Sequence, residues 1–187
     1  MPNAELSSRF PGRAAAFTCV HHNVSVSPRV RCLFYFITYI AGFGVDNIKM
    51  THQQQISIRT TGHGHMHDLT EQVAAVVAKS GIRTGTANVF NLGSTAAVGV
   101  IEFEPGLQHD LPNILDKLVP PSRSYGHEQA WHDGNGHSHL QATLLGQSLT
   151  VPIAEGKPLL GTWQQIFHLE CDVRGRQRTV IITVMGD

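Results

Sequence analysis

The pattern of hydrophobic and polar residues from residue 53 onward predicts an α+β fold. Strand-like runs rich in β-branched residues fall at residues 53–61, 84–91, 94–104, 148–153, 162–171 and 178–185. Helix-like patterns fall at residues 69–80, 110–118 and 138–145. Short connections between successive strands favour antiparallel pairing, so we expect a mainly antiparallel sheet or sandwich with two or three helices.

The first helix carries its own start and stop signals. Asp68 is the expected N-cap, and Glu71 follows three residues later, as a capping box requires. Gly81 is expected to end the helix in a left-handed conformation. The apolar positions between these residues share one helical face: Leu69, Val73, Val76 and Val77.

The connections between elements give three further predictions. Residues 84–91 and 94–104 are expected to form a strand pair joined near Gly93. The helix at residues 110–118 holds Pro112 in its first turn, where the missing N–H costs little. Residues 122–136 form a long polar loop without periodicity, which is typical of functional loops in compact domains.

Residues 1–49 differ from the rest of the chain, so we divide the 187 residues into an N-terminal extension, 1–49, and one domain, 50–187. The apolar run at residues 30–45 is interrupted by Arg31 and is shorter than the roughly 20 residues of a membrane helix. Three interpretations of residues 1–49 remain open. The native chain starts at Met50 and the assigned start lies upstream of it, or the segment is a loosely packed extension, or it is an anchor or signal. We favour the first.

Charge and cysteine usage narrow the class of protein. The formal net charge is zero and no basic run occurs, so we expect no nucleic-acid partner and, given the short apolar run, no membrane partner. The three cysteines are scattered and form no CxxC pair, which favours a reducing cytoplasm. Cys171 is expected to pack as a small hydrophobic residue.

A dense group of histidines in the 122–139 region is the first candidate site. Two or three imidazoles with a carboxylate are typical of metal sites that keep an open position. The expected ligands of a divalent metal, zinc or magnesium, are His127, His137, His139 and Asp133. The alternative is a set of surface histidines in a mobile loop.

The strand at residues 162–171 is the second candidate. Alternation assigns Trp163, Phe167 and Leu169 to the core face. The other face carries Gln164, Ile166, His168 and Glu170, and it either meets solvent or lines a pocket.

Weaker candidates lie elsewhere. Ser94 and Thr95 follow a glycine and could hold an oxyanion or phosphate. Glu102 and Glu104 share a strand face and either bind Mg²⁺ or decorate an exposed strand end. For the alternating histidines at positions 63, 65 and 67 we favour an exposed loop.

Residues 50–187 resemble the YjbQ family, whose members have also been called secondary thiamine-phosphate synthases. The motifs that carry the resemblance are Gly146-Gln-Ser-Leu-Thr-Val-Pro152, Gly161-Thr-Trp-Gln-Gln-Ile166, Tyr125-Gly-His127 and Ser138-His139-Leu140, with Glu170 and the closing strand downstream. One departure is Gly93, where some bacterial members have a histidine. The resemblance implies an α+β fold with much antiparallel sheet, a homotrimer and a metal ion near the shared histidines.

Together these features predict a metal-assisted enzyme for a small phosphorylated molecule, with weak thiamine-phosphate synthase activity. In this hypothesis His127 and His139 bind the metal and Glu170 or Asp133 completes its shell. Ser94 and Thr95 hold a phosphate, and Gln164 orients the substrate. Two alternatives remain open: a metal-dependent hydrolase of another small phosphate or ester, and a non-catalytic trimer with a structural metal.

Overall fold

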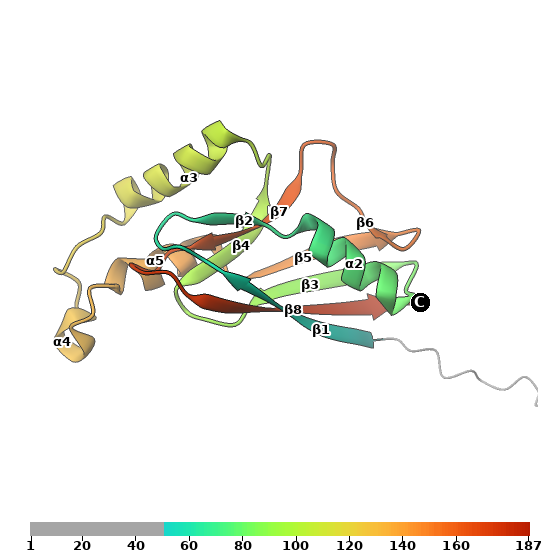
Figure 1. The fold of residues 1–187 in the computed structure, drawn as a ribbon, viewed down its shortest axis with the longest axis horizontal. Coiled ribbons are helices and arrows are strands. Elements are labelled where there is room, and N and C mark those ends of the chain that lie inside the picture. Colours follow the sequence, from blue (N-terminus) through green and yellow to red (C-terminus); the bar gives the residue numbers. More distant parts are fainter. Residues whose placement is uncertain (1–50) are drawn as a thin grey trace, which may run out of the picture. The chain divides into compact units, whose positions relative to one another are not determined.

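The computed structural model describes residues 51–187, and this part of the chain forms an α+β fold of two antiparallel sheets and four helices (Figure 1). The predicted extension, residues 1–49, lies outside the described residues. The strands are β1 Thr51–Arg59, β2 Met66–Asp68, β3 Gly85–Asn91, β4 Ala96–Ile101, β5 Ser148–Ala154, β6 Lys157–Pro158, β7 Gln165–Glu170 and β8 Gln177–Gly186. The helices are α2 Thr70–Ser80, α3 Pro105–Leu118, α4 Glu128–Trp131 and α5 Gly136–Leu145. The predicted fold class is confirmed, and α4 adds one short turn to the expected helices.

The larger sheet has the strand order β1-β8-β3-β5-β6, with every neighbouring pair antiparallel. Alternate residues of β8 are buried, among them Val180, Ile182 and Val184, because successive side chains point to opposite faces. These side chains belong to a core that α2 helps to cover.

Helix α2 behaves as the sequence predicts. All four residues of its apolar stripe are buried: Leu69, Val73, Val76 and Val77. Gly81 follows the helix with φ of 76°, the left-handed conformation that glycine adopts readily. The predicted N-cap is corrected, because Leu69 occupies that position and Asp68 ends β2. The Asp68 carboxylate still accepts a hydrogen bond from the Thr70 N–H at 2.8 Å.

The smaller sheet has the order β2-β7-β4, and its central strand is buried on both faces. Ile166 packs into the larger core, whereas Phe167 and Leu169 pack into a second core with Leu115 of α3 and Ala142 of α5. The prediction that Trp163 faces the core is therefore wrong. Trp163 precedes the strand, and 70% of its surface is exposed.

The predicted pairing of residues 84–91 with 94–104 is also wrong, because β3 and β4 lie in different sheets. Both edges of β3 are occupied, one by β5 and the other by β8, so no edge remains for β4. The chain leaves β3 at Asn91 and crosses to pair β4 with β7. This crossing places Leu92, Gly93 and Ser94 at the surface, whereas Thr95 is already buried.

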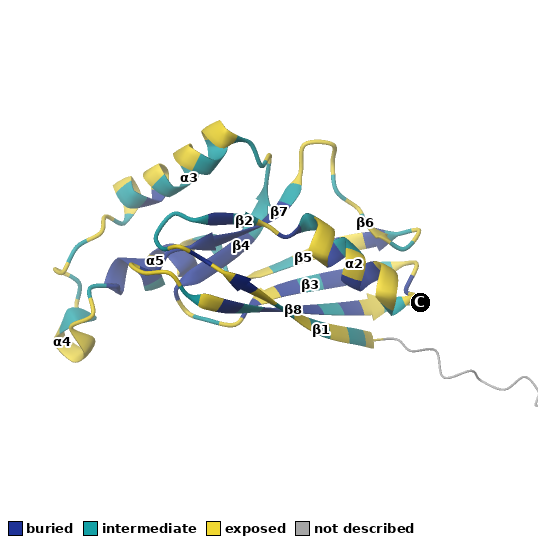
Figure 2. Cartoon of the chain, in the orientation of Figure 1, coloured by how far each residue is buried: buried dark blue, intermediate teal, exposed yellow. Residues whose placement is uncertain are grey.

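Helix α3 begins earlier than predicted, because Glu104 caps it. The Glu104 carboxylate accepts hydrogen bonds from the N–H groups of Gly106, at 2.7 Å, and Leu107, at 2.5 Å. Pro112 consequently lies inside the helix rather than in its first turn. Leu115 is the buried residue of α3, and Figure 2 shows the helix mostly exposed or half-buried over the smaller sheet. Among the described helices, none is long and apolar enough to cross a membrane.

Candidate functional site

One pocket of about 570 Å³ gathers most of the predicted site residues. Its walls come from three segments: the crossing loop after β3, the segment that contains α4 and the start of α5, and the turn between β7 and β8. The residues that line it are Gly93, Ser94, Thr95, His127, Trp131, Asp133, Asn135, His139, Asp172, Arg176, Gln177 and Arg178.

His127 and His139 lie side by side in this pocket, with ring centres 4.6 Å apart and ring planes inclined by 48°. Asp133 lies next to them, with its Oδ1 atom 3.6 Å from Nε2 of His127. A tight turn brings these residues together, since Gly134 has φ of 75° and its N–H donates to the Glu128 carboxylate. The chain therefore folds back so that the residue before α4 faces the first turn of α5.

Burial favours the neutral form of His139 and His137. It lowers the pKa of His139 below its ordinary value, and the neighbouring His127 lowers this pKa further. A neutral imidazole is the form that binds a metal ion. The pKa of His137 is also lowered, by burial first and by His63 second.

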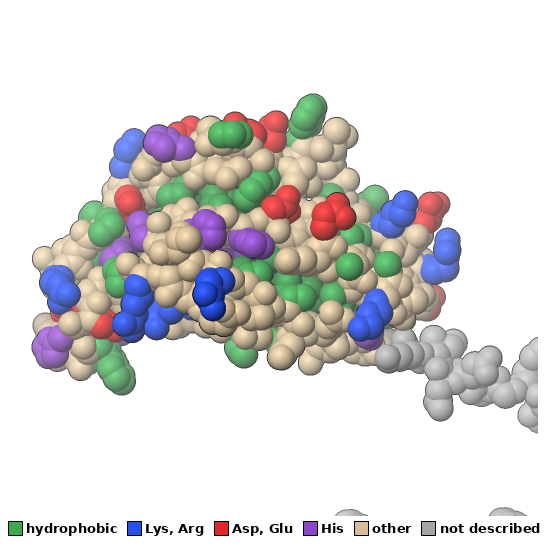
Figure 3. All heavy atoms as spheres, viewed as in Figure 1, with side chains coloured by type: hydrophobic (Ala, Val, Ile, Leu, Met, Phe, Trp, Pro, Cys, Tyr) green, Lys and Arg blue, Asp and Glu red, His purple; other side chains and the backbone are tan. Residues whose placement is uncertain are grey.

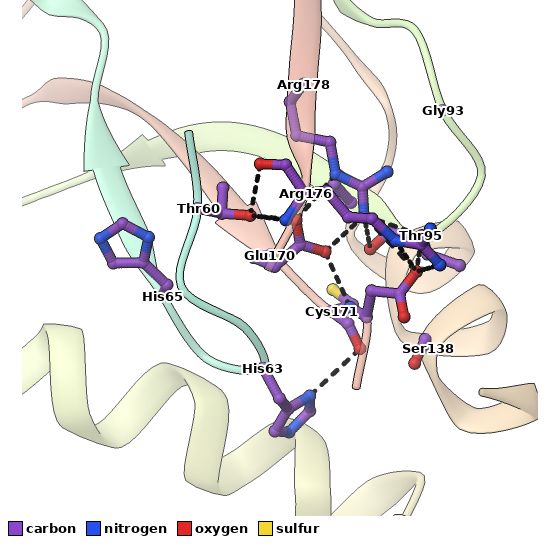
Figure 4. A network of polar contacts seen from close by, with 12 residues as sticks. Thr60, His63, His65, Gly93, Thr95, Ser138, Glu170, Cys171, Arg176 and Arg178 are labelled. Carbon is purple, nitrogen blue, oxygen red and sulfur yellow. Dashed lines mark hydrogen bonds and ion pairs between the residues drawn. The ribbon is translucent and has the colours of Figure 1, made fainter. Parts of the chain in front are cut away.

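A buried ion pair lies directly beneath the pocket (Figure 4). Arg178 donates from Nε to Glu170 Oε2 at 2.7 Å and from Nη2 to the other Glu170 oxygen. The hydroxyl group of Thr60 donates to Glu170 at 2.7 Å, and the N–H of Asp172 does so at 2.8 Å. Glu170 has no exposed surface, so it supports the pocket from below.

A second carboxylate, Asp172, organises the pocket floor. Its Oδ2 atom accepts hydrogen bonds from the Thr95 hydroxyl at 3.0 Å and from Arg176 Nε at 2.9 Å. Thr95 Oγ1 in turn accepts a bond from Arg178 Nη2 at 2.8 Å. The two arginines and two carboxylates thus form one network, which Thr95 bridges.

Two buried oxygen atoms on the pocket wall lack a hydrogen-bond partner within the described residues. They are Oδ1 of Asp172 and Oδ1 of Asn135, and both residues also line a smaller adjoining pocket of about 220 Å³. Buried polar atoms are nearly always satisfied, so such a pair indicates a place for a ligand, an ion or ordered water.

The predicted site residues are only partly brought together. His127, His139, Asp133, Ser94 and Thr95 line the pocket. Ser94 is exposed there, whereas the Thr95 hydroxyl is committed to the network beneath.

Three predicted residues lie outside the lining: Glu170, Gln164 and His137. Glu170 is fully buried in the ion pair with Arg178, so the strand face that carries it neither meets solvent nor lines the pocket. Gln164 is exposed, and its carboxamide oxygen accepts a bond from the Gly161 N–H at 2.8 Å in the turn before β7. His137 is buried, and its ring contacts His63 at 5.5 Å between ring centres.

The other histidine prediction needs correction. His63, His65 and His67 are half-buried rather than exposed, and His67 belongs to β2. His63 bonds to Asp116 of α3 at 2.8 Å and to the carbonyl oxygen of Cys171 at 3.1 Å. Figure 3 shows histidine side chains grouped on one face of the molecule below α3.

Cys171 is buried, as predicted, and burial raises the pKa of its thiol to about 12. Such a thiol remains protonated at neutral pH and is a poor nucleophile.

Sequence reasoning missed Asn135, Asp172, Arg176 and Arg178. The sequence Asp172-Val-Arg-Gly-Arg-Gln-Arg178 reads as a turn, and nothing local shows which way its arginines point. The available signal was their spacing, since residues two apart at the start of a strand share one face.

The residues present match part of a metal site. Two imidazoles that bind one zinc ion at about 2.0–2.1 Å have ring centres roughly 4.5–5.5 Å apart. The separation of His127 and His139 falls in that range. Within residues 51–187, however, no group of three or more His, Cys, Asp or Glu side chains is close enough to hold an ion by itself. The imidazole pair is thus a half-site that needs further donors.

Comparison with known proteins shows which family this chain resembles. Residues 54–187 match the model of the UPF0047, YjbQ-like protein family. A UPF0047 protein of Methanothermobacter thermautotrophicus is 42% identical over 133 residues, which are 71% of this chain and 91% of that protein. The UPF0047 protein YugU of Bacillus subtilis is 32% identical over 133 residues, which are 70% of this chain and 97% of YugU.

Solved structures support the same family and fold. A YbjQ-like protein of unknown function from Sulfolobus solfataricus has a TM-score of 0.66 at 35% identity, covering 73% of this chain and 99% of its own. A hypothetical protein from Aeropyrum pernix has a TM-score of 0.64 at 32% identity, covering 72% of this chain and 99% of its own. These similarities establish a family and a fold, and they name no reaction.

Proposed function

The chain belongs to the YjbQ-like UPF0047 family, and from the geometry of its pocket we propose that it is a metal-assisted enzyme acting on a small phosphorylated molecule. The observation that carries the proposal is the close pair His127 and His139 in the same pocket as Arg176 and Arg178. Imidazoles bind a cation, arginines bind an anion, and a cavity of about 570 Å³ is large enough for a small metabolite.

His127 and His139 would hold a divalent metal, with the Asp133 carboxylate beside them. Imidazole nitrogen suits zinc, and the unpartnered oxygens of Asp172 and Asn135 suit magnesium as well. A bound ion would polarise phosphoryl oxygens and neutralise charge on a leaving group. The Ser94 hydroxyl, exposed on the crossing loop, would donate a hydrogen bond to the substrate.

Within this class we propose weak thiamine-phosphate synthase activity, because YjbQ-family members have also been called secondary thiamine-phosphate synthases. In that reaction the bond between the pyrimidine methylene carbon and pyrophosphate breaks. A bond forms from the same carbon to the thiazole nitrogen, and pyrophosphate leaves with the electron pair. No oxidant or proton donor is required, so a pocket that binds phosphates and neutralises charge would suffice.

We further propose a cytoplasmic homotrimer with this pocket near a boundary between copies. The half-site character of the histidine pair supports the idea, because a neighbouring chain could supply the missing donors. So does Trp131, which lines the pocket although 70% of its surface is exposed in the isolated chain. The cysteine within the described residues, Cys171, is unpaired, which is consistent with a reducing compartment.

The test uses the full chain, the two thiamine precursors, and zinc or magnesium. Turnover and metal content are measured for the natural protein and for His139→Ala. Loss of a direct ligand is expected to lower kcat/KM and metal affinity by about 100-fold or more, since even loss of a supporting residue costs 10- to 100-fold. His109→Ala is the matched control, because its side chain on α3 is 76% exposed and lies outside the pocket lining.

Parallel assays separate the alternatives. A panel of phosphomonoesters and carboxylic esters identifies a hydrolase if turnover appears there and not with the thiamine precursors. Chelation that dissolves the oligomer, with no turnover of any substrate, would identify a structural metal in a non-catalytic protein. Unchanged turnover and metal content in His139→Ala would remove the assigned metal site.

A further inference from the structure

Arg178 is held in a fixed orientation that leaves part of its guanidinium group uncommitted. Its Nε and Nη2 atoms bind Glu170 and Thr95, and only 8% of its side-chain surface is exposed. Within residues 51–187, no acceptor is hydrogen-bonded to its remaining nitrogen, Nη1. A guanidinium group carries five N–H donors, and Nη1 is not among the buried atoms that lack a partner, so this nitrogen is accessible and free to donate to a ligand in the pocket that Arg178 lines.

Arg176 repeats the arrangement two residues earlier. Its Nε and Nη2 atoms contact Oδ2 of Asp172, at 2.9 and 2.7 Å, and 34% of its side-chain surface is exposed. Its Nη1 likewise has no acceptor in the described part of the chain. Each arginine is thus fixed by one carboxylate along one edge, and both arginines line the pocket. Figure 4 shows the two side chains running together toward Thr95 and the crossing loop.

The crossing loop approaches Arg178 closely at Gly93. A Cβ atom added to Gly93 would lie 2.9 Å from Nη1 of Arg178, so only glycine allows this close approach. Ser94, the next residue, is exposed and lines the same pocket. Ser94 therefore adds a hydroxyl donor to the same pocket that the two arginines line.

We propose that Arg176 and Arg178, with Ser94, form an anion-binding subsite that recognises a phosphoryl group. This inference deepens the proposed function, because it names the residues that hold the phosphate independently of any metal. Planar guanidinium edges form paired hydrogen bonds with phosphate oxygens, and the larger negative charge of a phosphate strengthens its attraction to two arginines relative to a carboxylate. Glu170 and Asp172 are positioning residues for this subsite, since their carboxylates orient the two arginines.

The test is phosphate binding by the metal-stripped full chain, measured by titration calorimetry in buffer passed over a chelating resin. Inorganic phosphate, pyrophosphate and acetate are the probes, and phosphate and pyrophosphate are expected to bind more tightly than acetate. Arg176→Gln should weaken phosphate binding by about tenfold or more, the effect of losing hydrogen bonds to a charged group. Arg83→Gln is the matched control, because Arg83 is exposed and absent from the pocket lining.

A second variant keeps the test decisive if Arg176→Gln fails to fold. Gly93→Ala adds one methyl group at Nη1 of Arg178 and keeps every charge, and it should weaken phosphate binding by a similar factor. His139→Ala should retain phosphate binding in this metal-free assay, although it loses metal affinity in the assay of the proposed function. Failure of the metal proposal is therefore distinguishable from failure of this inference. No phosphate binding by the natural protein, equal affinity for acetate, or unchanged binding in both Arg176→Gln and Gly93→Ala would overturn the inference.

Discussion

Asn91 and His168 are joined by a buried hydrogen bond of 3.1 Å between Asn91 Oδ1 and His168 Nε2. The bond links the last residue of β3 to the central strand of the other sheet. The Asn91 amide nitrogen donates at the same time to the carbonyl oxygens of Gly93, at 2.8 Å, and Ala96, at 3.2 Å. This one side chain therefore fixes both ends of the crossing loop that forms a wall of the pocket.

The arrangement also determines which nitrogen of His168 carries the proton. Because the Asn91 amide nitrogen donates to two carbonyl oxygens, its Oδ1 must accept, and His168 must donate from Nε2. Burial, followed by the charge of Arg178, lowers the pKa of His168 to about 3. The ring is therefore neutral in the folded protein at neutral pH.

The first prediction concerns pH and stability. Unfolded His168 titrates near its ordinary value of 6.5 and the folded residue near 3, so the unfolded state binds more protons between these limits. The free energy of unfolding should therefore fall as the pH decreases from 6.5 toward 3, by the order of 4 kcal/mol from this residue. Urea unfolding at pH 7, 5.5 and 4 measures the slope.

The comparison variant is His168→Gln, which keeps a donor for Asn91 and cannot titrate. Its stability should depend less steeply on pH than that of the natural protein. Some slope should remain, because His137 and His139 also have lowered pKa values. Identical slopes in the two proteins would contradict the assignment.

The second prediction is that Asn91→Ala destabilises the fold and disturbs the pocket. The change leaves one donor and two carbonyl oxygens without their partner, and each unsatisfied buried group costs about 1–3 kcal/mol. We expect a loss of at least about 2 kcal/mol in urea unfolding. Asn88→Ala is the control, because Asn88 bonds to Ser148 and Thr150 in an exposed environment and should cost less than about 1 kcal/mol. Equal losses in the two variants would count against a special role for Asn91.

The third prediction concerns the ion pair under the pocket. Glu170→Gln keeps the shape of the side chain and removes the charge that Arg178 requires, which leaves a buried guanidinium group without its counter-charge. Breaking such a pair costs about 3–5 kcal/mol, and we expect a loss of that order. Denaturant unfolding of Glu170→Gln and of the exposed control Glu155→Gln measures it. A loss below about 1 kcal/mol would mean that Arg178 is not held by this carboxylate.

The fourth prediction concerns helix α3, whose single buried residue is Leu115. Asp116 ties the helix to the remainder of the fold, since its Oδ1 atom contacts His63 Nε2 at 2.8 Å and Gln141 Nε2 at 2.9 Å. Asp116→Asn should therefore increase amide hydrogen exchange throughout α3, with a loss of about 1–2 kcal/mol in local stability.

The matched control is Asp110→Asn on the same helix. Asp110 pairs with His109 in an exposed position, where an ion pair contributes little. Exchange in α3 should remain near that of the natural protein in this variant. If Asp116→Asn leaves exchange in α3 unchanged as well, another contact must hold the helix.

The sequence predicts those elements whose patterns are local. The apolar stripe of α2 and the left-handed Gly81 were identified correctly, because a helix buries one face and ends by rules that span only a few residues. The same local reasoning failed for β3 and β4. Each run is strand-like, but the free edges that remain for pairing depend on strands far along the chain.

The candidate site likewise contains residues that the sequence identified and residues that it misplaced. The density of histidines in the 127–139 segment identified His127, His139 and Asp133, and a tight turn brings them together within a short stretch. Gln164 was misplaced relative to the pocket because the strand was extended three residues too far, as β7 begins at Gln165. The prediction that Trp163 faces the core was wrong for the same reason.

By itself, the sequence determined the α+β class, the family motifs and the histidine pair, because these depend on short-range periodicity and on residues close together in the chain. Only the tertiary structure decided that Arg178 reaches Thr95, 83 residues away in sequence, and that Asp172 and Arg176 complete the same pocket. Those contacts arise where two sheets meet, and the register of strands distant in sequence sets them. No local pattern carries that information.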